Sequence, residues 1–270
     1  MISSYKPPLT VKKMTEHLAK SKRVVFNDIS EQEAQEILYT HNYINVISPF
    51  KYRFAKKNKK GLTIKDKNGN HIYERDVDFK EYYDLYVAER NKYPKLFRSI
   101  SCFEQLFSSV VSYEVLNAYC LKDPAAFSNF ISILRGNINS SQYKETVKNH
   151  NRDVVDNLEK SIEEYGNPYV VFDTLSLHSL LAILVSLDDG PKHRCIEEIT
   201  KRQSIVKADD EKTFYDQVSK IIRIRNCICH NDSLEILLRY LSRKHKTLRT
   251  SSDKYSYAKM IEKIQSEQWD

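Results

Sequence analysis

The amino-acid sequence predicts an all-α protein: an antiparallel helical bundle preceded by an N-terminal helical extension with a short β-hairpin. Apolar residues recur at spacings of three and four over most of the 270 residues, which is the period of an amphipathic helix. One stretch departs from this period around Asn68-Gly69, a dipeptide typical of a hairpin turn. We therefore expect an N-terminal domain over residues 1–78 and a helical bundle over residues 79–270.

The N-terminal domain contains the hairpin and a basic segment in front of it. Residues 62–64 and 71–73 flank the Asn-Gly turn and are predicted to be its strands. Residues 51–60 contain six Lys or Arg with two aromatic residues between them. This composition suits contact with RNA phosphates and bases, and equally an ordinary solvated surface. The candidate RNA-binding residues are Lys51, Arg53, Lys56, Lys57, Lys59 and Lys60.

The second domain contains helices with one apolar face and one helix that is apolar on nearly every side. Residues 100–111, 154–162 and 214–228 repeat apolar side chains at helical spacing. Residues 175–187 are apolar almost throughout, as expected at the centre of a bundle. Helix boundaries are predicted at Pro94, Asp123-Pro124, Gly166-Asn167-Pro168 and Gly190-Pro191.

Composition excludes several function classes. The five glycines are isolated from one another, so no glycine-rich phosphate loop exists, which excludes P-loop NTPases and ordinary dinucleotide-binding enzymes. The net charge of +7 is compatible with a nucleic-acid partner. The cysteines lack CxxC spacing, and neither a signal-peptide core nor an apolar run of membrane length occurs. We therefore expect a soluble, cytoplasmic protein without a membrane partner.

The segment RIRNCICHND, residues 223–232, is the clearest candidate for catalysis. In it Arg225-Asn226 is followed by His230. Arginine offers a planar fork that matches phosphate oxygens, and histidine exchanges protons near neutral pH. This pair suffices for cleavage of RNA without a metal ion. A base takes the 2′-OH proton, the oxygen attacks phosphorus, and the arginine stabilises the charge that develops.

Helical geometry leaves the choice of arginine open. Arg225 and His230 lie about 140° apart on a straight helix, whereas Arg223 lies within about 20° of His230. Either the helix breaks between Arg225 and His230, or Arg223 shares the role. Arg225 is the first candidate because Asn226, a polar supporting residue, follows it.

Chance pairs of this type also occur in the chain. Arg239 and His245 have a similar spacing, but no Asn follows Arg239. Glu104 is a candidate for orienting His230 or Arg225, and an ordinary solvated glutamate is an equal alternative.

A metal site is the weaker interpretation of the cysteines. Cys227, Cys229 and His230 lack a second half-site of zinc-ligand spacing, so packing of small residues on a helix explains them better. His178 lies within an apolar helix and is better explained as a polar group of the core. We expect neither a metal nor a cofactor.

Five stretches of the sequence point together to one family. In chain order they are KPPLT at 6–10, NYINVISPFKYRF at 42–54, the Phe79, Leu85-Tyr86 and Arg90 helix, NPYVVFDTLSLHSLL at 167–181, and RNCICHN at 225–231. They resemble the Abi-like family, abortive-infection proteins of AbiD and AbiF type with a HEPN domain. The last stretch resembles the HEPN signature Arg-Asn-x-x-x-His. The chain departs from the family pattern at Tyr169 for Trp, Asp173 for Glu, His178 for Gly and Cys229 for Ala.

The resemblance implies a HEPN bundle that acts as a metal-independent, toxin-like antiphage endoribonuclease, with Arg225 and His230 as catalytic residues. It also implies a homodimer. Physical reasoning agrees, because cleavage needs a base and an acid, and a two-fold axis through the site would supply two histidines. The expected partners are RNA and an antitoxin.

Two alternatives remain open. The first is a HEPN-like RNA-binding protein that holds a structured non-coding RNA in a defence ribonucleoprotein with little or no cleavage. The second is a protein-interaction module that senses phage through a partner.

Overall fold

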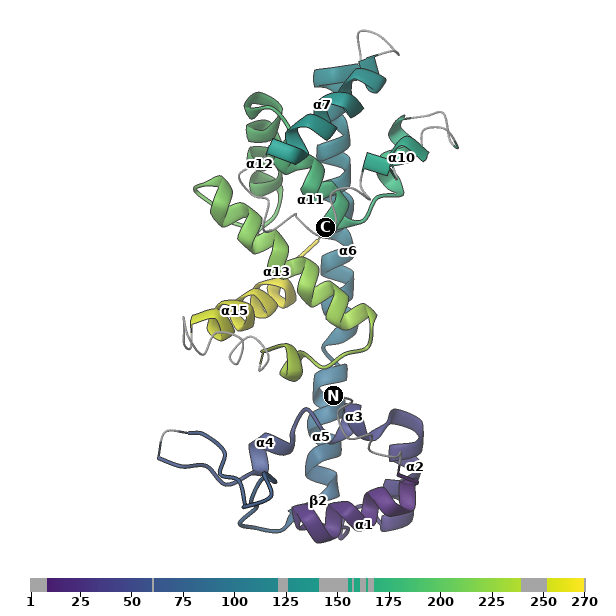
Figure 1. Ribbon diagram of the computed structural model, residues 1–270, viewed down its shortest axis with the longest axis vertical. Helices are drawn as coiled ribbons and strands as arrows, with labels where there is room; N and C mark the ends of the chain where they lie inside the picture. Colours follow the sequence, from purple (N-terminus) through teal and green to yellow (C-terminus); the bar gives the residue numbers. More distant parts are fainter. Residues whose placement is uncertain are drawn as a thin grey trace. The chain divides into compact units, whose positions relative to one another are not determined.

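The computed structural model describes residues 9–59, 61–120, 126–140, 155–156, 158–160, 164, 168–238 and 252–269. These residues are mostly helical (Figure 1), which confirms the predicted fold class. The chain forms two compact units. Unit 1 comprises Met1–Tyr93 and Cys227–Thr250, and unit 2 comprises Pro94–Asn226 and Ser251–Asp270. The domain boundary predicted from the sequence lies after residue 78. The compact units divide elsewhere, after Tyr93 and again after Asn226. The division into domains 1–78 and 79–270 therefore stays a prediction.

Between residues 9 and 92, the described part of unit 1 forms five helices, which begin at caps or short turns. They are α1 (Val11–Lys22), α2 (Glu31–His41), α3 (Tyr43–Val46), α4 (Lys51–Phe54) and α5 (Phe79–Arg90). Ser30 and Glu33 form a capping box at the start of α2, and Asp78 and Glu81 form another at the start of α5. Each box satisfies backbone N–H groups that have no partner within the helix, which fixes where the helix starts.

The core of unit 1 lies among α1, α2 and α5. Its fully buried side chains include Leu18, Phe79 and Tyr82. A two-residue parallel ladder, β1 (Val24–Val25) with β2 (Val77–Asp78), joins the end of α1 to the start of α5. This parallel pair was not predicted from the sequence.

The expected hairpin is present as isolated bridges. Across the expected turn Lys65 pairs with His71, and the backbone N–H of Ile72 donates to the Ile64 carbonyl at 3.1 Å. The other two bridges, Lys57 with Thr63 and Ala55 with Tyr73, join the expected strands to the basic segment, a pairing that was not predicted. The turn between Lys65 and His71 is closed by the Asp66 carboxylate, which accepts bonds from the backbone N–H groups of Asn68 and Asn70. Gly69 takes φ +81°, a conformation that favours glycine.

Unit 2 is built from α6 (Tyr93–Val115), the π-helical turn η1 (Leu116–Cys120), α7 (Ala126–Ser140), α10 (Pro168–Asp173), α11 (Leu177–Ser186), α12 (Asp189–Arg202), α13 (Glu211–Cys229) and α15 (Ser252–Ser266). The helices predicted over residues 100–111 and 214–228 correspond to parts of α6 and α13. Most of residues 154–162, and the boundaries at Asp123-Pro124 and Gly166-Asn167, lie outside the described residues.

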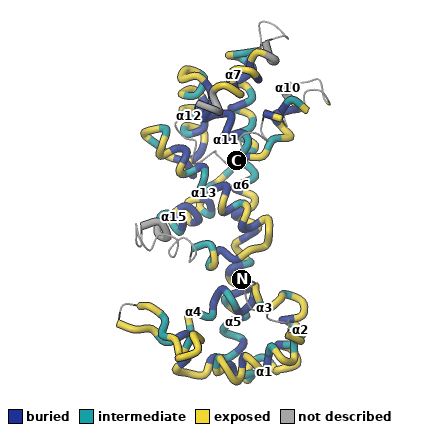
Figure 2. Tube along the Cα trace, viewed as in Figure 1, coloured by how far each residue is buried: buried dark blue, intermediate teal, exposed yellow. Residues whose placement is uncertain are grey.

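Helix α11 forms the centre of unit 2, as the sequence predicts. Most of its residues, from Leu180 to Ser186 without interruption, are buried (Figure 2). Pro94 and Pro191 both lie in the first turn of a helix, where a missing N–H costs no hydrogen bond. Phe107 of α6 and Phe214 of α13 are fully buried, with ring centroids 6.3 Å apart. This contact fixes α13, which carries the candidate motif, against α6.

Candidate functional site

The motif lies at the C-terminal end of α13, and the helix ends directly after it. The backbone N–H of Asn231 donates to the carbonyl of Ile228 at 3.0 Å, and that of Asp232 donates to Cys227 at 2.8 Å. Asn231 has φ +56°. This is the Schellman arrangement, in which a residue in the left-handed conformation terminates a helix. His230 is therefore the C-cap residue of α13.

The predicted alternative of a break between Arg225 and His230 is wrong, because α13 is continuous through Cys229. By the helical period alone, Arg225 and His230 are about 140° apart. Arg223, Asn226 and His230 are exposed, whereas Arg225 is half-buried. The boundary between the units falls after Asn226, so His230 belongs to unit 1 and Arg225 to unit 2.

Arg225 is held by Glu104 of α6. Its Nε lies 3.2 Å from Glu104 Oε1, and its Nη1 donates to Asn226 Oδ1 at 3.4 Å. Burial raises the pKa of Glu104, and the charge of Arg225 opposes this shift. The sequence left open whether Glu104 orients His230 or Arg225. The ion pair shows that Glu104 contacts Arg225. The pair fixes the guanidinium through Nε and leaves Nη2 without a hydrogen bond to a described residue.

Arg223 has a different partner. Its Nη1 donates to the hydroxyl of Tyr257 on α15 at 3.1 Å. Tyr257 is buried whereas Arg223 is exposed, so this single bond directs one end of the guanidinium and leaves the rest in solvent. The second pair considered, Arg239 and His245, lies outside the described residues.

In unit 1, Arg90 clamps the turn that follows His230. Arg90 Nη1 donates to Asn231 Oδ1 at 2.7 Å, and Nη2 donates to the Asn231 carbonyl at 3.0 Å. The guanidinium lies 5.1 Å from the ring centroid of Tyr86 and 4.8 Å from that of Tyr93. Tyr93 adds a bond from its hydroxyl to the Asp232 carbonyl at 2.5 Å. The backbone next to the candidate histidine is therefore fixed by the end of α5 and the residues after it.

Glu89 of α5 holds the residues that follow this turn, Ser233 to Glu235. It is buried, and its Oε1 accepts from Ser233 Oγ at 3.0 Å and from the backbone N–H of Glu235 at 2.8 Å. It thereby caps the helical residues 234–238. Burial raises the pKa of Glu89, and the two donated bonds oppose this shift. The resemblance indicated Arg90, but no sequence signal indicated Glu89.

Replacing Arg90 by alanine is expected to destabilise unit 1 by about 2–3 kcal/mol, the value of bonds from a charged donor that leave their partners unpaired. Urea unfolding followed by circular dichroism measures this change. Arg90→Lys should recover little, because an ammonium cannot donate to both Asn231 oxygens in the geometry of a guanidinium. Lys92→Ala, at an exposed cation two residues away, is the control. Equal midpoints for Arg90→Ala and Lys92→Ala would contradict the clamp.

Glu89→Gln should change how stability depends on pH. Because the pKa of Glu89 is raised in the folded state, the unfolded chain loses this proton first as pH rises, and folding stability falls. The fall begins at the ordinary glutamate pKa of about 4.3 and is complete above the raised value. Glutamine keeps an acceptor oxygen for Ser233 and Glu235 but does not titrate. The unfolding free energy of the variant relative to wild type should therefore rise from pH 4 to pH 7, and a constant difference would refute the role of burial.

The basic segment divides into paired and unpaired side chains. Arg53 forms an ion pair with Glu235 at 2.9 Å, and Lys56 forms one with Glu74 at 2.5 Å. Lys57 and Lys59 are exposed, and within the described residues neither has an ion pair. Lys60 lies outside the described residues. Fewer of the six cations are free for RNA than the sequence alone implies.

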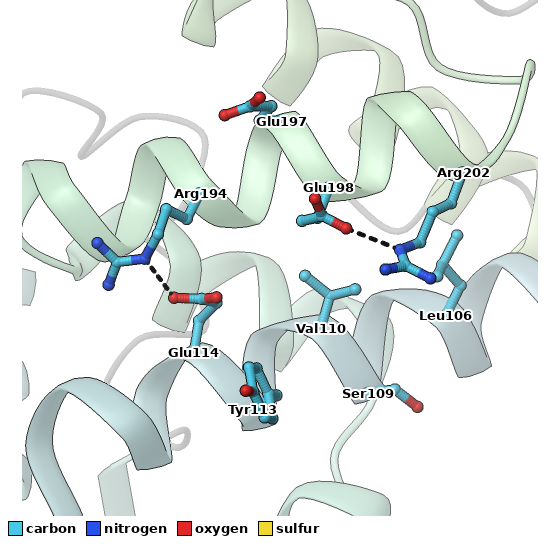
Figure 3. A pocket seen from close by; sticks show the side chains of 9 residues that line it. All are labelled: Leu106, Ser109, Val110, Tyr113, Glu114, Arg194, Glu197, Glu198 and Arg202. Carbon is cyan, nitrogen blue, oxygen red and sulfur yellow. Dashed lines mark hydrogen bonds and ion pairs between the residues drawn. The ribbon is translucent and has the colours of Figure 1, made fainter.

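Unit 2 has a pocket of about 670 Å³ between α6 and α12 (Figure 3). Leu106, Val110 and Tyr113 form its apolar side. Arg194 pairs with Glu114 at 2.7 Å and Arg202 with Glu198 at 2.8 Å, as the dashed lines in Figure 3 mark. Since these charges neutralise one another, we assign the pocket no part in binding RNA.

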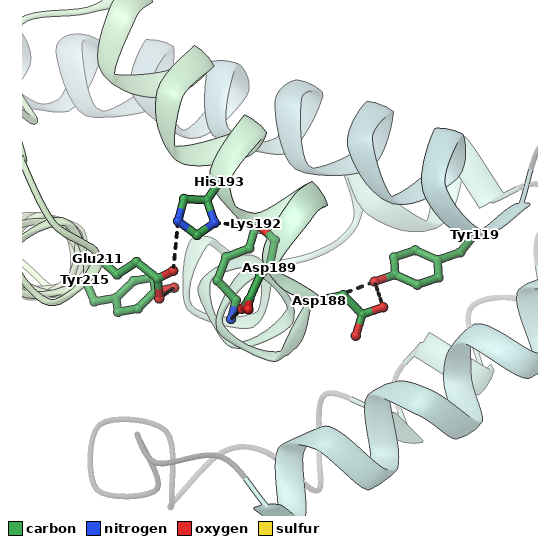
Figure 4. A network of polar contacts seen from close by, with 7 residues as sticks. All are labelled: Tyr119, Asp188, Asp189, Lys192, His193, Glu211 and Tyr215. Carbon is green, nitrogen blue, oxygen red and sulfur yellow. Dashed lines mark hydrogen bonds and ion pairs between the residues drawn. The ribbon is translucent and has the colours of Figure 1, made fainter.

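A polar network joins η1, α12 and the start of α13 (Figure 4). The Tyr119 hydroxyl donates to Asp188 Oδ2 at 2.8 Å, and burial raises the pKa of Tyr119 to about 12. His193 Nδ1 lies 2.7 Å from the Asp189 carbonyl, and its Nε2 lies 3.9 Å from Glu211 Oε1. These contacts hold the first turns of two helices together, which is a structural role.

Other expectations concern metal ligands and membranes. Cys227 is buried in α13 and Cys229 is exposed. Across the part of the chain that the structure describes, no three His, Cys, Asp or Glu residues are grouped to hold a metal ion. Nor does any helix within the described ranges have the length and apolar character to cross a membrane.

Comparison with protein families decides the relationship that the motifs indicate. The model of the family described as Abi-like protein matches residues 36–234, most of the chain. The chain belongs to the Abi-like protein family. The matched region includes Arg90, Glu104 and the motif up to His230. No curated protein and no solved structure matches the chain.

Membership of the Abi-like family suggests a role in abortive-infection defence. The Abi-like match also contains Glu89 and the segment that it anchors. It leaves out α1 and α15, and with α15 the Tyr257 partner of Arg223. The contacts of Arg225 and of the His230 turn therefore lie within the region shared with the family, whereas the contact of Arg223 does not.

Proposed function

We propose that the chain is a metal-independent endoribonuclease of HEPN type that acts in abortive infection. The observation that supports this most is the end of α13, where an exposed histidine caps a helix whose arginine is already oriented by Glu104. Both groups are held from other helices, Arg225 by α6 and the turn after His230 by α5. A site whose parts are fixed before the substrate binds loses less free energy in reaching the transition state. The all-α architecture is compatible with a HEPN bundle.

The reaction follows from the chemistry of the two groups. The neutral imidazole of His230 takes the proton of an RNA 2′-hydroxyl, and the 2′-oxygen forms a bond to the adjacent phosphorus. The bond from phosphorus to the 5′-oxygen breaks, and that oxygen receives a proton from an acid. Arg225 donates to the phosphate oxygens as their negative charge increases. The products are a 2′,3′-cyclic phosphate and a 5′-hydroxyl.

The decisive experiment is cleavage of RNA by the purified chain in EDTA, with analysis of the product ends. Activity should persist and leave a 2′,3′-cyclic phosphate and a 5′-hydroxyl. A strict requirement for Mg²⁺ would overturn the proposal. A defined RNA that co-purifies with the chain and is not cleaved would favour the RNA-binding alternative instead.

The proposal includes a two-fold dimer with the ends of α13 facing each other. Arg225 and His230 diverge by about 140° on one helix, so two chains bring these groups to one phosphate more readily than a single chain does. The partner's His230 would also supply the acid that the leaving oxygen needs.

Mixing equal amounts of wild type and His230→Ala tests this arrangement. After subunit exchange about a quarter of the dimers contain two wild-type chains. If mixed dimers are inactive, activity is therefore about a quarter of that of wild type alone at the same total concentration, whereas simple dilution would leave about half. The two chains are mixed, allowed to exchange, and assayed against unmixed controls at the same total concentration. A chain that is monomeric by light scattering and cleaves at the full rate would refute the composite site.

A further inference from the structure

Two lysines of unit 1 lie beside the same short segment, residues 71–73, without an acidic partner: Lys22 contacts the ring of Tyr73, and Lys51 contacts the ring of Tyr52, which packs on His71. Lys22 is the last residue of α1, and Lys51 is the first residue of α4. Both are half-buried. Among the described residues, no ion pair or hydrogen bond involves the side-chain amine of either one. Two carboxylates of the neighbouring segment have other partners, since Glu74 pairs with Lys56 and Asp76 with Arg23.

The proximity of the two lysines is unfavourable in the absence of an anion. Burial, followed by the charge of Lys51, lowers the pKa of Lys22 to about 8. A cation that is partly removed from water and faces a second cation raises the free energy of the folded state. An oxyanion bound to both amines would remove both costs, because it would replace their lost hydration and neutralise their mutual repulsion.

Aromatic rings hold the two amines in place. Lys22 Nζ lies 5.5 Å from the ring centroid of Tyr73, and Lys51 Nζ lies 5.1 Å from that of Tyr52. Both distances are within the range of a cation–π contact. Tyr73 is 7% exposed and so forms a rigid support. Tyr52 is half-buried and makes a T-shaped contact with the ring of His71, with centroids 4.7 Å apart.

We propose that Lys22 and Lys51 together bind a phosphate group of RNA, with the ring of Tyr52 beside it as a surface for a base. Two cations and an adjacent ring are the combination that binds single-stranded RNA without reading its sequence. This inference rests on the proposed RNA function and names the place where the backbone of the RNA is held. It adds Lys22, which precedes the basic segment by almost thirty residues and lies outside the matched family region.

The binding test uses the full chain with His230→Ala, so that RNA is not consumed. Affinity for a short fluorescein-labelled single-stranded RNA is measured by anisotropy over a range of salt concentrations. Lys22→Gln and Lys51→Gln should each weaken binding and reduce the slope of log affinity against log salt by about 0.7, the value for one lost phosphate contact on a single strand. Lys20→Gln, an exposed lysine on the same helix, is the control and should change neither quantity. Equal slopes for Lys22→Gln and Lys20→Gln would overturn the site.

Chemical labelling separates RNA from free phosphate as the ligand. At pH 8 Lys22 should react with an acetylating reagent faster than Lys20, because a large share of it is uncharged. RNA and millimolar inorganic phosphate should both slow this reaction, whereas chloride of equal ionic strength should not. Protection by phosphate but not by RNA would overturn the assignment to RNA, and protection by neither would overturn the site itself. Protection by RNA in a chain that cleaves nothing would uphold the site and reject the nuclease.

Discussion

Replacing His230 by alanine is expected to abolish RNA cleavage and leave the fold intact. Loss of a general base costs about 10²–10⁴ in rate, and a composite site would lose both of its histidines at once. The fold should tolerate the change because His230 is exposed. Among the described residues its ring makes no hydrogen bond or ion pair. Initial rates in EDTA and the far-ultraviolet circular dichroism spectrum measure the two effects.

Two additions to this experiment show that the imidazole itself is needed. Free imidazole should restore part of the activity of His230→Ala, since it can occupy the vacated space and accept the same proton. His193→Ala removes another exposed histidine in a helical setting and should retain full activity. If His230→Ala cleaves at the wild-type rate, the base lies elsewhere and the assignment fails.

Local pattern was sufficient to predict the helices and several of their ends. The apolar period marks α6 and α13, the continuous apolar run marks α11, and Pro94 and Pro191 mark first turns. These signals depend only on neighbouring residues. The division into units depends on contacts such as that of Arg90 with Asn231, which are 141 residues apart in sequence, and no local pattern reveals such a contact.

In the candidate site too, features set by neighbouring residues were predictable from the sequence, whereas contacts between residues far apart in the chain were not. The spacing of the motif indicated an arginine and a histidine, and Asn231 is a residue that tolerates the left-handed conformation in which a helix ends. A helix end at this asparagine is therefore readable from local sequence alone. For Glu104 the sequence left contact and solvation equally open, and only the packing of α6 beside α13 places it at Arg225. Glu89 was missed because its partners follow it by 144 and 146 residues.

Replacing Arg225 by alanine should reduce cleavage by about 10²–10³, the loss that follows removal of one donor to a developing oxyanion. Arg225→Lys should restore little, since lysine cannot contact Glu104 and donate to two phosphate oxygens at once. Glu104→Gln keeps the shape of the partner and removes its charge. It should lower the rate less than Arg225→Ala, because the guanidinium remains and only its orientation is lost. All three variants should keep the helical circular dichroism spectrum.

Arg223→Ala is the matched comparison, since it removes an arginine from the same helix two residues away. Arg223 has one hydrogen bond, to Tyr257, and an exposed guanidinium, so it enters the reaction less well oriented than Arg225. Its loss should change the rate by less than about tenfold, as expected for a peripheral phosphate contact. The opposite ranking, with Arg223→Ala inactive and Arg225→Ala nearly normal, would transfer the role to the arginine that shares the face of His230. In that case Glu104→Gln should have no effect on the rate, because the pair with Arg225 would then serve only to attach α13 to α6.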